Sequence, residues 1–445
     1  MNKILIFLLI FLAFSCGTND KILKKKNFSF QNYNYENWWE KFNDNKLNFL
    51  IEQAIKNNLD LKLAYLNIKK ARYYYKVAKS ELFPNIYLQG SRIRYKKYLH
   101  GLPKFIPKKI KEDQFNLNID LRYELDLWQK NYLKTISKKH EKLVERYFLQ
   151  LEKKSLISTV CLIYFEIKKN LKILNLQRKI LKILNNSKDI LISKFQNGLT
   201  SNDVLRNIEI RITSIKEIIP IISSNIKILK SSLKVLLNNS KSNINISPSW
   251  KFRLIKIPMQ TPAKIVLNRP DINILMEKIF VNKINLAISK KALLPSFSFT
   301  WNYGYESAKL SKLIKNSSSL YNLTVSFIQT LFDYGKRKNL IKISEINLEE
   351  SKIELRNKIL EAVKEVEDNL NKLENLKLKR AEILNKISQY RKILKIENEK
   401  FLSDLSNLGK INDIKIKILS EKINLIETEG QIIFTEIKIL KAMGY

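Results

Sequence analysis

The sequence predicts a mainly α-helical chain with a small β part, in which one helix–strand–strand–helix–helix unit occurs twice. Three observations predict this fold class. Two long stretches, residues 130–196 and 336–401, contain neither Gly nor Pro, the residues that interrupt helices. Four shorter segments alternate apolar and polar residues, as a strand with two different faces requires. The two halves of the chain are also similar to each other, which indicates an internal repeat.

The composition excludes several classes of protein. The 445 residues include 81 Lys plus Arg and 42 Asp plus Glu, so the formal net charge is +39. A hydrophobic share of 45% is sufficient for a buried core, which argues against a disordered chain. Two Cys and two His cannot supply a disulfide framework or a Cys-cluster zinc site. Because Lys is abundant in every segment, we interpret the charge as a compositional bias, with a functional basic face as the alternative.

The first residues predict export. An apolar run at 4–14 follows a basic residue and is too short to cross a bilayer as a helix, which predicts a signal peptide over residues 1–15. Cys16 follows directly and resembles the lipidated Cys of a bacterial lipobox; the alternative is a plain signal peptide with an incidental Cys. Gly17 is not the Asp that commonly retains such lipoproteins at the inner membrane, which favours the outer membrane. We expect residues 16–46 to hold the lipid anchor and an extended segment.

The first copy of the repeat is expected over residues 47–237. Its strands are predicted at about 85–95 and 115–127, and Pro84 stands where a helix gives way to the first strand. The first strand is the less regular one, because its alternation changes phase near Gly90. In the second strand the alternation is strict, with apolar side chains at Phe115, Leu117, Ile119, Leu121, Tyr123, Leu125 and Leu127.

The second copy is expected over residues 264–445. Its strands are predicted at about 296–305 and 320–330, where apolar and aromatic residues again alternate with small polar ones. Pro295 stands before the first of these strands, so the same helix-to-strand transition is predicted in both copies.

An Asn-, Ser- and Pro-rich stretch at 238–263 separates the copies and is predicted to be a linker. A shift of 211 residues pairs Pro84 with Pro295, and a shift of 206 pairs Phe195 with Phe401. The repeat therefore extends from the first helix of each copy to its last.

The predicted strands have the length that crosses a bilayer at a tilt, and their aromatic residues cluster as in interfacial girdles. A half-buried sheet of an ordinary globular protein is the alternative. Four strands cannot close a membrane barrel, because the smallest known barrels have eight and an open edge in lipid is costly. We therefore expect the chain to oligomerise; three copies would supply about twelve strands, enough for an aqueous lumen.

The breaker-free stretches are predicted to be helices that pack side by side. Roughly 65 residues at about 1.5 Å each would give a helix near 100 Å long, which one globular core cannot accommodate. In the second stretch the apolar residues recur at steps of three and four, the spacing of a coiled coil: Leu355, Ile359, Val363, Val366, Leu370, Leu373 and Leu376.

Six sequence fragments follow one another along the chain: NNLDLKLAYLNIKKARYYYKVAKSELFP (57–84), YELDLW (123–128), FQNGLTSNDVL (195–205), RPDINILMEKIFVNKINLAISKKALLPSFSFTW (269–301), LFDYGKRK (331–338) and LKAMG (440–444). In this order they resemble one family, the outer-membrane efflux channels of the TolC/OprM type, and in particular its lipoprotein branch. The resemblance implies a homotrimer with a long periplasmic α-helical barrel and a transmembrane β-barrel completed by trimerisation. It also implies three kinds of partner: a periplasmic adaptor (membrane fusion) protein, an inner-membrane transporter and the lipid of the outer membrane.

The function that the resemblance implies is a passive export duct of a tripartite efflux system, which carries small molecules such as drugs and toxic compounds. Within the same fold, the alternative is the outer-membrane channel of a type I protein secretion system. An alternative of a different class is a basic, soluble coiled-coil protein that binds nucleic acid; the interpretation we adopt includes no nucleic acid.

Candidate site residues lie at the turns between helices. Gly198 and Asp203 are assigned to the tip of the first helical hairpin, with Asp203 as a helix cap. Asp413 matches the carboxylate that narrows the periplasmic mouth in this family. Three such carboxylates around a threefold axis would repel one another and attract a cation. The alternative is that Asp413, directly after Asn412, caps the last helix.

The sequence departs from the family pattern at two turns. Gln129 replaces the Gly that usually follows YELDLW, whereas the second copy keeps Gly335 at the strand-to-helix turn. Asp404 stands where the second copy normally has the Gly that corresponds to Gly198.

No nucleophile, base and orienting acid stand at a recognisable spacing, so we expect no enzyme, no metal and no cofactor other than a covalent lipid on Cys16. We assign no function to His100, in the loop between the first two strands, or to His140, on a helix. Cys161 is expected to be a small core residue.

Overall fold

The computed structural model describes residues 37–98, 109–241, 243–255, 257, 269–403 and 405–445. Cys16, His100 and Asp404 lie outside the described residues. The chain divides into two compact units, each built from three segments of the sequence. The described part of unit 1 comprises 68–144 and 276–353, and that of unit 2 comprises 37–67, 145–275 and 354–445, with the gaps listed above.

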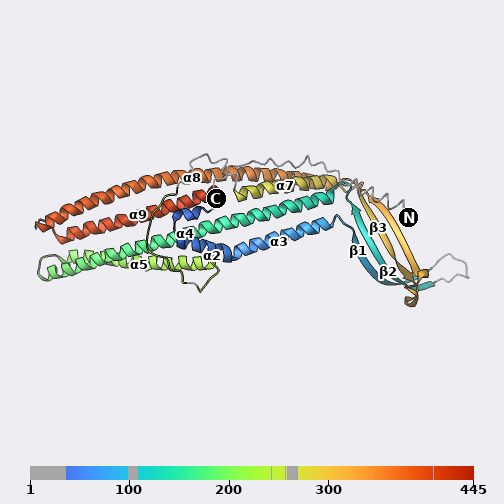
Figure 1. The fold of residues 1–445 in the computed structure, drawn as a ribbon, viewed down its shortest axis with the longest axis horizontal. Helices are drawn as coiled ribbons and strands as arrows, with labels where there is room; N and C mark the ends of the chain where they lie inside the picture. Colours follow the sequence, from blue (N-terminus) through green and yellow to red (C-terminus); the bar gives the residue numbers. More distant parts are fainter. Residues whose placement is uncertain (1–36, 99–108, 242, 256, 258–268, 404) are drawn as a thin grey trace. The chain divides into compact units, whose positions relative to one another are not determined.

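The predicted fold class is confirmed: long helices dominate and a small sheet interrupts them (Figure 1). The first copy runs through α2 (Asn45–Asn57), α3 (Leu59–Ser80), β1 (Asn85–Tyr98), β2 (Lys109–Leu125), α4 (Lys130–Gln196) and α5 (Asn202–Leu236). The second runs through α7 (Pro270–Lys291), β3 (Ser296–Ser307), β4 (Ser319–Ile328), α8 (Lys336–Leu402) and α9 (Leu408–Ala442). Corresponding helices have equal lengths of 22, 67 and 35 residues.

Unit 1 contains the whole sheet and the helix ends next to it. The strands pair antiparallel in the order β1-β2-β3-β4, so β1 and β4 are edge strands. The adjoining helix ends are joined by side-chain hydrogen bonds from α3 to α4, α4 to α7 and α7 to α8. These bonds are Thr135 Oγ1 to the Ala78 carbonyl (3.1 Å), Ser137 Oγ to Asn285 Oδ1 (3.3 Å) and Ser289 Oγ to Ser344 Oγ (2.9 Å).

The two strands of the first copy differ most from their predicted bounds. β2 ends at Leu125 rather than at Leu127, because Asp126 accepts hydrogen bonds from the N–H groups of Asn131 and Tyr132 at the start of α4 (3.0 and 2.7 Å). β1 and β2 also pair farther toward their shared loop than the apolar alternation indicated. Charged residues replace apolar ones in this outer part, and the backbone hydrogen bonds between β1 and β2 continue although the apolar–polar alternation has ended.

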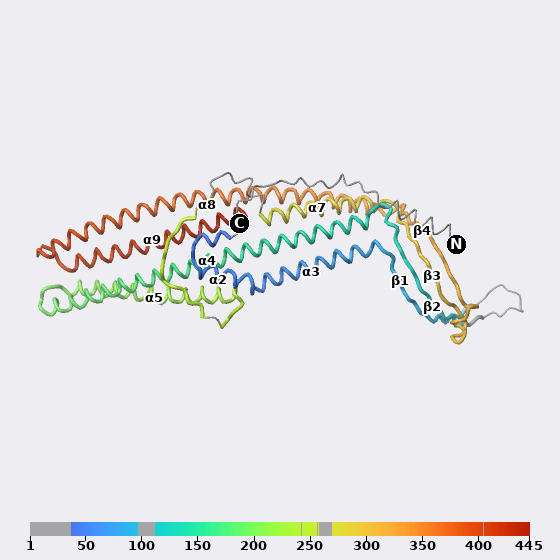
Figure 2. Tube along the Cα trace, viewed as in Figure 1, coloured from blue at the N-terminus to red at the C-terminus, as the bar shows by residue number. Residues whose placement is uncertain are grey.

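Unit 2 contains the main hydrophobic core. The α4–α5 hairpin and the α8–α9 hairpin each fold back on themselves in this unit (Figure 2). The core joins residues of α2, α4, α5 and α9 to a short 3-10 helix, Trp38–Phe42, and to the segment between the two copies. In the part of the chain that the structure describes, no helix is long and apolar enough to cross a membrane.

The segment expected to be extended, 16–46, contains the 3-10 helix Trp38–Phe42 in its described part, and α2 begins at Asn45. Trp38 and Phe42 are buried in the core, and Asp44 caps α2 by accepting from the N–H of Leu47 (3.3 Å). The same carboxylate accepts from Tyr164 Oη and Lys168 Nζ, both at 2.8 Å. Burial alone would raise the pKa of Asp44, but the hydrogen bonds from Lys168 and Tyr164 lower it. This ionic contact anchors the N-terminal segment on α4.

Candidate functional site

The four strands place two different surfaces on the two faces of the sheet. Residues paired across neighbouring strands share a face, so the register defines rows that cross the sheet. One face is apolar: its rows contain Leu125, Phe297 and Phe327; Tyr123, Phe299 and Val325; Ile86, Leu121, Trp301 and Leu323; and Leu88, Ile119, Tyr303 and Tyr321. Most of these side chains are exposed in the single copy. Among the residues that the structure describes, this face therefore has no partner.

The opposite face is polar and mostly uncharged. Its rows contain Asn118 with Gln89 and Gly304, and Asp120 with Tyr87, Asn302 and Asn322. Asp120 accepts a hydrogen bond from Asn302 and is only 4% exposed. Gly304 is required there, because a Cβ at that position would lie 2.4 Å from the Leu117 carbonyl oxygen of the neighbouring strand. An amide-rich surface of this kind suits the wall of a water-filled passage.

The turns next to the strands lie where the sequence places them. Pro84 directly precedes β1 and Pro295 directly precedes β3. Trp128 Nε1, from the YELDLW fragment, donates to the Pro295 carbonyl (2.7 Å) and so links the two copies. Before α8, Gly335 has a left-handed backbone with φ of 78°. Gln129 has the same conformation before α4, with φ of 58°, although it has a Cβ.

The tips of the two helical hairpins close in the same way. At the first tip, Gly198 has a φ of 67° and the N–H of Leu199 donates to the Lys194 carbonyl (2.8 Å). At the second, the N–H of Leu405 donates to the Lys400 carbonyl (2.8 Å). This bond spans five residues, as in a Schellman motif, and the two bonds are related by the 206-residue shift.

The structure places Asp413 inside α9 rather than at its start. Asn407 is the N-cap and accepts a hydrogen bond from the N–H of Lys410, so the alternative role of Asp413 as a cap is wrong. Asp413 Oδ1 instead lies 2.9 Å from Arg211 Nη1 on α5, and both side chains are about half exposed. The neighbouring Asn412 donates to Ser187 Oγ on α4 (2.9 Å). The N-terminal part of α9 is thus linked to both helices of the first hairpin.

Asp203 is not a cap either. Ser201 occupies the N-cap position of α5, without a side-chain hydrogen bond, and Asp203 lies in the first turn. A carboxylate there is favourable because the N-terminal end of a helix carries partial positive charge.

The remaining singled-out residues lie in packed interiors. His140 Nδ1 lies 2.5 Å from the buried carboxylate of Glu277 on α7, and its ring stacks on Phe280. Cys161 is fully buried in the core of unit 2, and burial raises the pKa of its thiol. His140 therefore connects α4 to α7, and Cys161 fills space in the core of unit 2.

Sequence analysis missed the packing of the segment between the copies. Trp250 Nε1 donates to Glu429 Oε2 (2.8 Å), and Arg380 Nε donates to the other oxygen of that carboxylate (2.9 Å). The Ile255 N–H donates to the fully buried carboxylate of Glu436 (3.3 Å). Burial raises the pKa of Glu436 to about 8, against the opposing effects of the Ile255 N–H and Lys377. The aromatic and apolar residues within the otherwise polar linker were the one feature of the sequence that could have indicated this packing.

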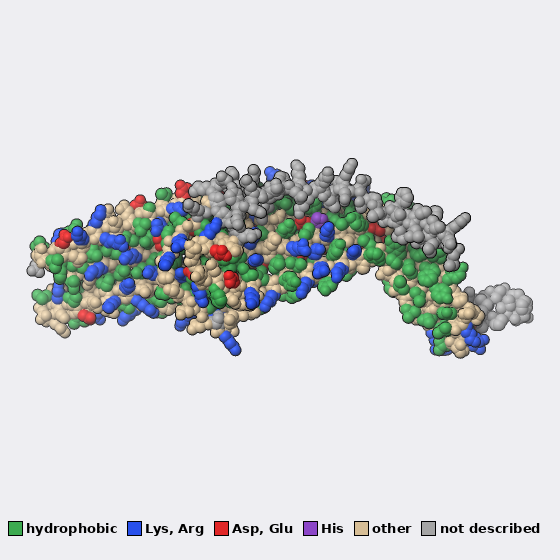
Figure 3. All heavy atoms as spheres, viewed as in Figure 1, with side chains coloured by type: hydrophobic (Ala, Val, Ile, Leu, Met, Phe, Trp, Pro, Cys, Tyr) green, Lys and Arg blue, Asp and Glu red, His purple; other side chains and the backbone are tan. Residues whose placement is uncertain are grey.

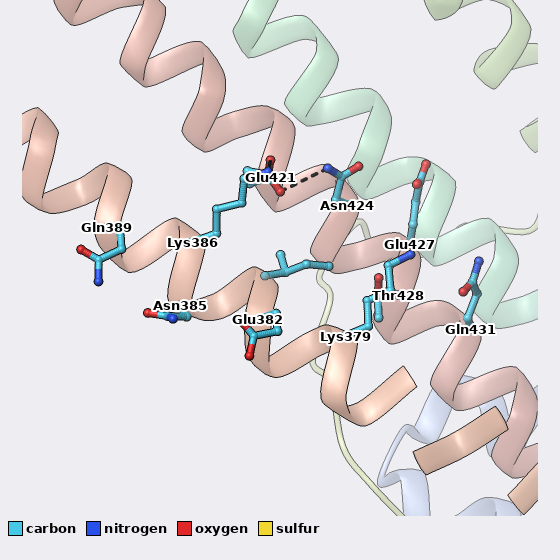
Figure 4. A pocket seen from close by; sticks show the side chains of 11 residues that line it. Lys379, Glu382, Asn385, Lys386, Gln389, Glu421, Asn424, Glu427, Thr428 and Gln431 are labelled. Carbon is cyan, nitrogen blue, oxygen red and sulfur yellow. Dashed lines mark hydrogen bonds and ion pairs between the residues drawn. The ribbon is translucent and has the colours of Figure 1, made fainter. Parts of the chain in front are cut away.

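Unit 2 also has a polar groove between α8 and α9 (Figure 4). It has a volume of about 600 Å³ and is lined by amide and charged side chains of both helices. Lys386 of α8 pairs with Glu421 of α9, which also accepts from Asn424 Nδ2 (3.2 Å). These groups can bind the polar surface of a partner protein. Among the described residues, no cluster of His, Cys, Asp and Glu suits a metal ion.

Comparison with known proteins gives the same family. The model of the family described as "Outer membrane efflux protein" matches residues 50–208 and 264–445, which is most of the chain. "Probable outer membrane lipoprotein SilC" of Salmonella typhimurium is 25% identical over 351 residues, 76% of this chain and 72% of that protein. "Toluene efflux pump outer membrane protein TtgI" of Pseudomonas putida is 22% identical over 413 residues, 91% of this chain and 86% of that protein.

Solved structures show the same fold. The crystal structure of CusC covers 93% of this chain and 95% of its own, with a TM-score of 0.82 and 20% identity. The Campylobacter jejuni CmeC outer membrane channel covers 95% and 90%, with a TM-score of 0.83 and 23% identity. These likenesses show the fold that the resemblance in the sequence implied, and the matched family model places the chain in the outer membrane. The chain belongs to the outer membrane efflux protein family.

Proposed function

We propose that this protein is the outer-membrane duct of a tripartite efflux system, in which three copies form one continuous passage for small molecules. The duct is passive, and an inner-membrane transporter drives export through it. A periplasmic adaptor protein connects the two, and the polar groove between α8 and α9 offers it hydrogen-bonding groups. Relatives are named for different cargoes, cations for CusC and toluene for TtgI, so we assign the choice of cargo to the transporter.

The observation that carries this proposal is an open sheet with an exposed apolar face. Within the described ranges, no strand pairs with the outer edge of β1 or of β4, and Leu88, Tyr321 and Phe327 are 74%, 79% and 69% exposed. Such a surface is not stable in water, and such edges are not stable in lipid. Further copies that pair β4 of one chain with β1 of the next would cover both edges, with the apolar face toward lipid and the polar face toward the lumen.

The helices provide an independent argument for neighbouring copies. On α3, the exposed residues Leu59, Leu66 and Tyr73 recur every seven residues. On α8, the exposed residues Ile346, Ile353 and Leu360 do the same. Apolar residues at heptad spacing require a partner helix, and the described part of a single chain provides none at these positions. We assign both stripes to contacts between copies.

Asp413 is proposed as a residue that holds the periplasmic end closed. Its pair with Arg211 joins the two hairpins near their tips, and an exposed pair of this kind contributes about 0–1 kcal/mol, which is small enough to be broken during opening. The corresponding residue in the first copy is Asn207. We therefore expect Asp413→Asn to raise the single-channel conductance in planar bilayers, while Asn207→Ala leaves it unchanged. Equal conductance of Asp413→Asn and the unaltered protein would remove Asp413 from the gate.

The proposed anchor is a lipid on Cys16, which lies outside the described residues. Labelling of growing cells with radioactive palmitate tests it: the unaltered protein should be labelled and Cys16→Ala should not. Label on the Cys16→Ala protein would contradict this assignment.

A further inference from the structure

The outer part of the β1–β2 hairpin gathers most of its basic residues on one face. In the register of the two strands, Arg92 is paired with Phe115 in the last aromatic row of the apolar face, and Arg94 is paired with Asp113 in the next row outward. Lys96 is two residues farther on the same strand, has the same parity and is exposed. The register also places Lys111 opposite Lys96, and Lys109 lies two residues farther along β2, so five basic residues and one carboxylate occupy positions on this face.

The opposite face has acidic residues at the same level. Glu112 accepts a hydrogen bond from Tyr95 Oη (2.7 Å), and Glu306 accepts one from Gln114 Nε2. At this level the acidic side has one basic position, Lys97, against five on the other side. A general bias toward Lys would fill both sides alike, so the excess of cations on one face is a property of this site.

The cations lie at a defined level with respect to the apolar face. The apolar rows extend from Leu125 to Phe115 along β2, ten residue steps at about 3.3 Å, or about 33 Å of strand. A tilt of about 40° converts this length into a band about 25 Å tall, the height of the lipid-facing band of membrane barrels. Arg92 lies in the last row of that band, and Arg94 directly follows it. In Figure 3 the hydrophobic surface of the sheet likewise ends in a group of Lys and Arg side chains at its tip.

The two guanidinium groups are held in place by one carboxylate. Arg94 Nε lies 2.7 Å from Asp113 Oδ1, and Arg92 Nη2 lies 3.2 Å from Asp113 Oδ2. Arg92 also lies over the ring of Phe115, 5.3 Å from its centroid. Both arginine side chains remain more than half exposed, so donors are left for a ligand. Arg guanidinium groups that are fixed side by side match the oxygens of a phosphate group.

We propose that Arg92, Arg94 and Lys96 bind the phosphate group of an anionic lipid in the leaflet that surrounds the outer ends of the strands. The inference rests on the proposed function, because it requires the apolar face to be turned toward lipid. Asp113 is a positioning residue that orders the two arginines, and the aromatic ring of Phe115 supports one of them at the boundary of the apolar band.

Lipid retention tests the proposal. The purified protein in a neutral detergent is incubated with phosphatidylglycerol or phosphatidylcholine, and native mass spectrometry measures the lipid that remains bound. Arg92→Gln/Arg94→Gln should lower the affinity for phosphatidylglycerol about tenfold, since each basic residue near an anionic lipid surface contributes to binding. Lys216→Gln/Lys227→Gln, which removes the same charge from exposed positions of α5, should leave retention unchanged. Arg92→Lys/Arg94→Lys should restore most of it.

The possible results separate this inference from the proposed function. If Arg92→Gln/Arg94→Gln retains phosphatidylglycerol as the control does, and both variants still conduct in planar bilayers, the lipid site is wrong and the duct stands. If inorganic phosphate displaces the lipid at equal concentration, the site is one for free phosphate and the assignment to lipid is wrong. If the unaltered protein does not conduct, the proposed function itself fails.

Discussion

The two copies of the repeat have helices of equal length, yet within unit 2 their long helices are packed differently. In α4, Val160, Cys161 and Ile167 are fully buried, and the core surrounds this helix with α2, α5, α9 and the linker. In α8, buried residues such as Val366 and Leu373 form a narrow stripe, and apolar residues such as Leu360 remain exposed. Duplication has thus preserved lengths and turns, while one long helix became interior and the other kept a surface for a neighbouring copy.

The linker adds a second difference between the copies. Its contacts through Trp250 and Ile255 go to Glu429 and Glu436 of α9. Shifted by 206 residues, these two positions are Ser223 and Lys230 of α5. Buried carboxylates that hold the linker are therefore a feature of the second copy alone in the described structure.

The largest expected effect concerns Glu436 and pH. Its folded-state pKa is raised to about 8 by burial, above the ordinary value of 4.5, so the native state binds the proton more tightly than the unfolded state. This contribution to stability is complete below pH 4.5 and is lost as the pH rises toward 8. Relative to Glu436→Gln, the unaltered protein should lose on the order of 4 kcal/mol between pH 5 and pH 9. Unfolding in detergent, followed by circular dichroism, measures it.

Glu427→Gln is the matched control, because Glu427 is an exposed carboxylate on the same helix. Its stability should follow that of the unaltered protein at every pH. If Glu436→Gln shows the same pH dependence as this control, the buried carboxyl is not protonated at neutral pH and the contrast between the copies weakens.

A smaller effect is expected at the C-terminal turns of α5 and α9. Asn238 and Gly444 correspond under the 206-residue shift and have positive φ values of 48° and 80°. A Cβ on Gly444 would lie 3.2 Å from the Cα of Arg269, and left-handed backbone disfavours any side chain. Gly444→Ala should therefore lower the unfolding free energy by about 2 kcal/mol. Asn238→Gly should change it by only a few tenths. Equal effects at both turns would show that contact with Arg269 is irrelevant.

The smallest expected effect is at the strand-to-helix turns. Gln129→Gly should raise the unfolding free energy by about 1 kcal/mol, since Gly adopts the positive φ of this position without a Cβ penalty. Gly335→Ala should lower it by a similar amount, because the surrounding space is open and only the backbone conformation opposes the new side chain. Thermal unfolding of both variants measures the difference. A destabilised Gln129→Gly would mean that the Gln side chain makes a contact worth more than the strain.

Much of the fold could be predicted from local sequence patterns, namely long stretches without Gly or Pro and the regular alternation of apolar and polar residues. The absence of breakers gave α4 and α8 nearly to the residue, and the strict alternation of β2 identified its apolar face. The extension of β1 and β2 could not be predicted, because charged residues such as Arg94 and Asp113 stabilise that part of the hairpin by pairing with each other. The alternation of apolar and polar residues along one strand does not predict such cross-strand charge pairs.

The site was less predictable than the fold. Resemblance directed attention to Asp413, but its partner Arg211 lies 202 residues away and on another hairpin, so only the folded chain shows the pair. The roles of Glu429 and Glu436 were likewise hidden, since their burial depends on how a non-helical segment packs.

The most direct test of the account is whether β1 of one copy pairs with β4 of another. Within one chain these strands lie three strand spacings apart, about 14 Å, which is too far for a disulfide. Proteins with one Cys placed in β1 and one in β4, scanned from Gln89 and Asn322, are oxidised in the membrane and separated by denaturing electrophoresis. The account predicts a covalent product of three chains, and none larger, for the matching pairs. Single chains at every pair would contradict it.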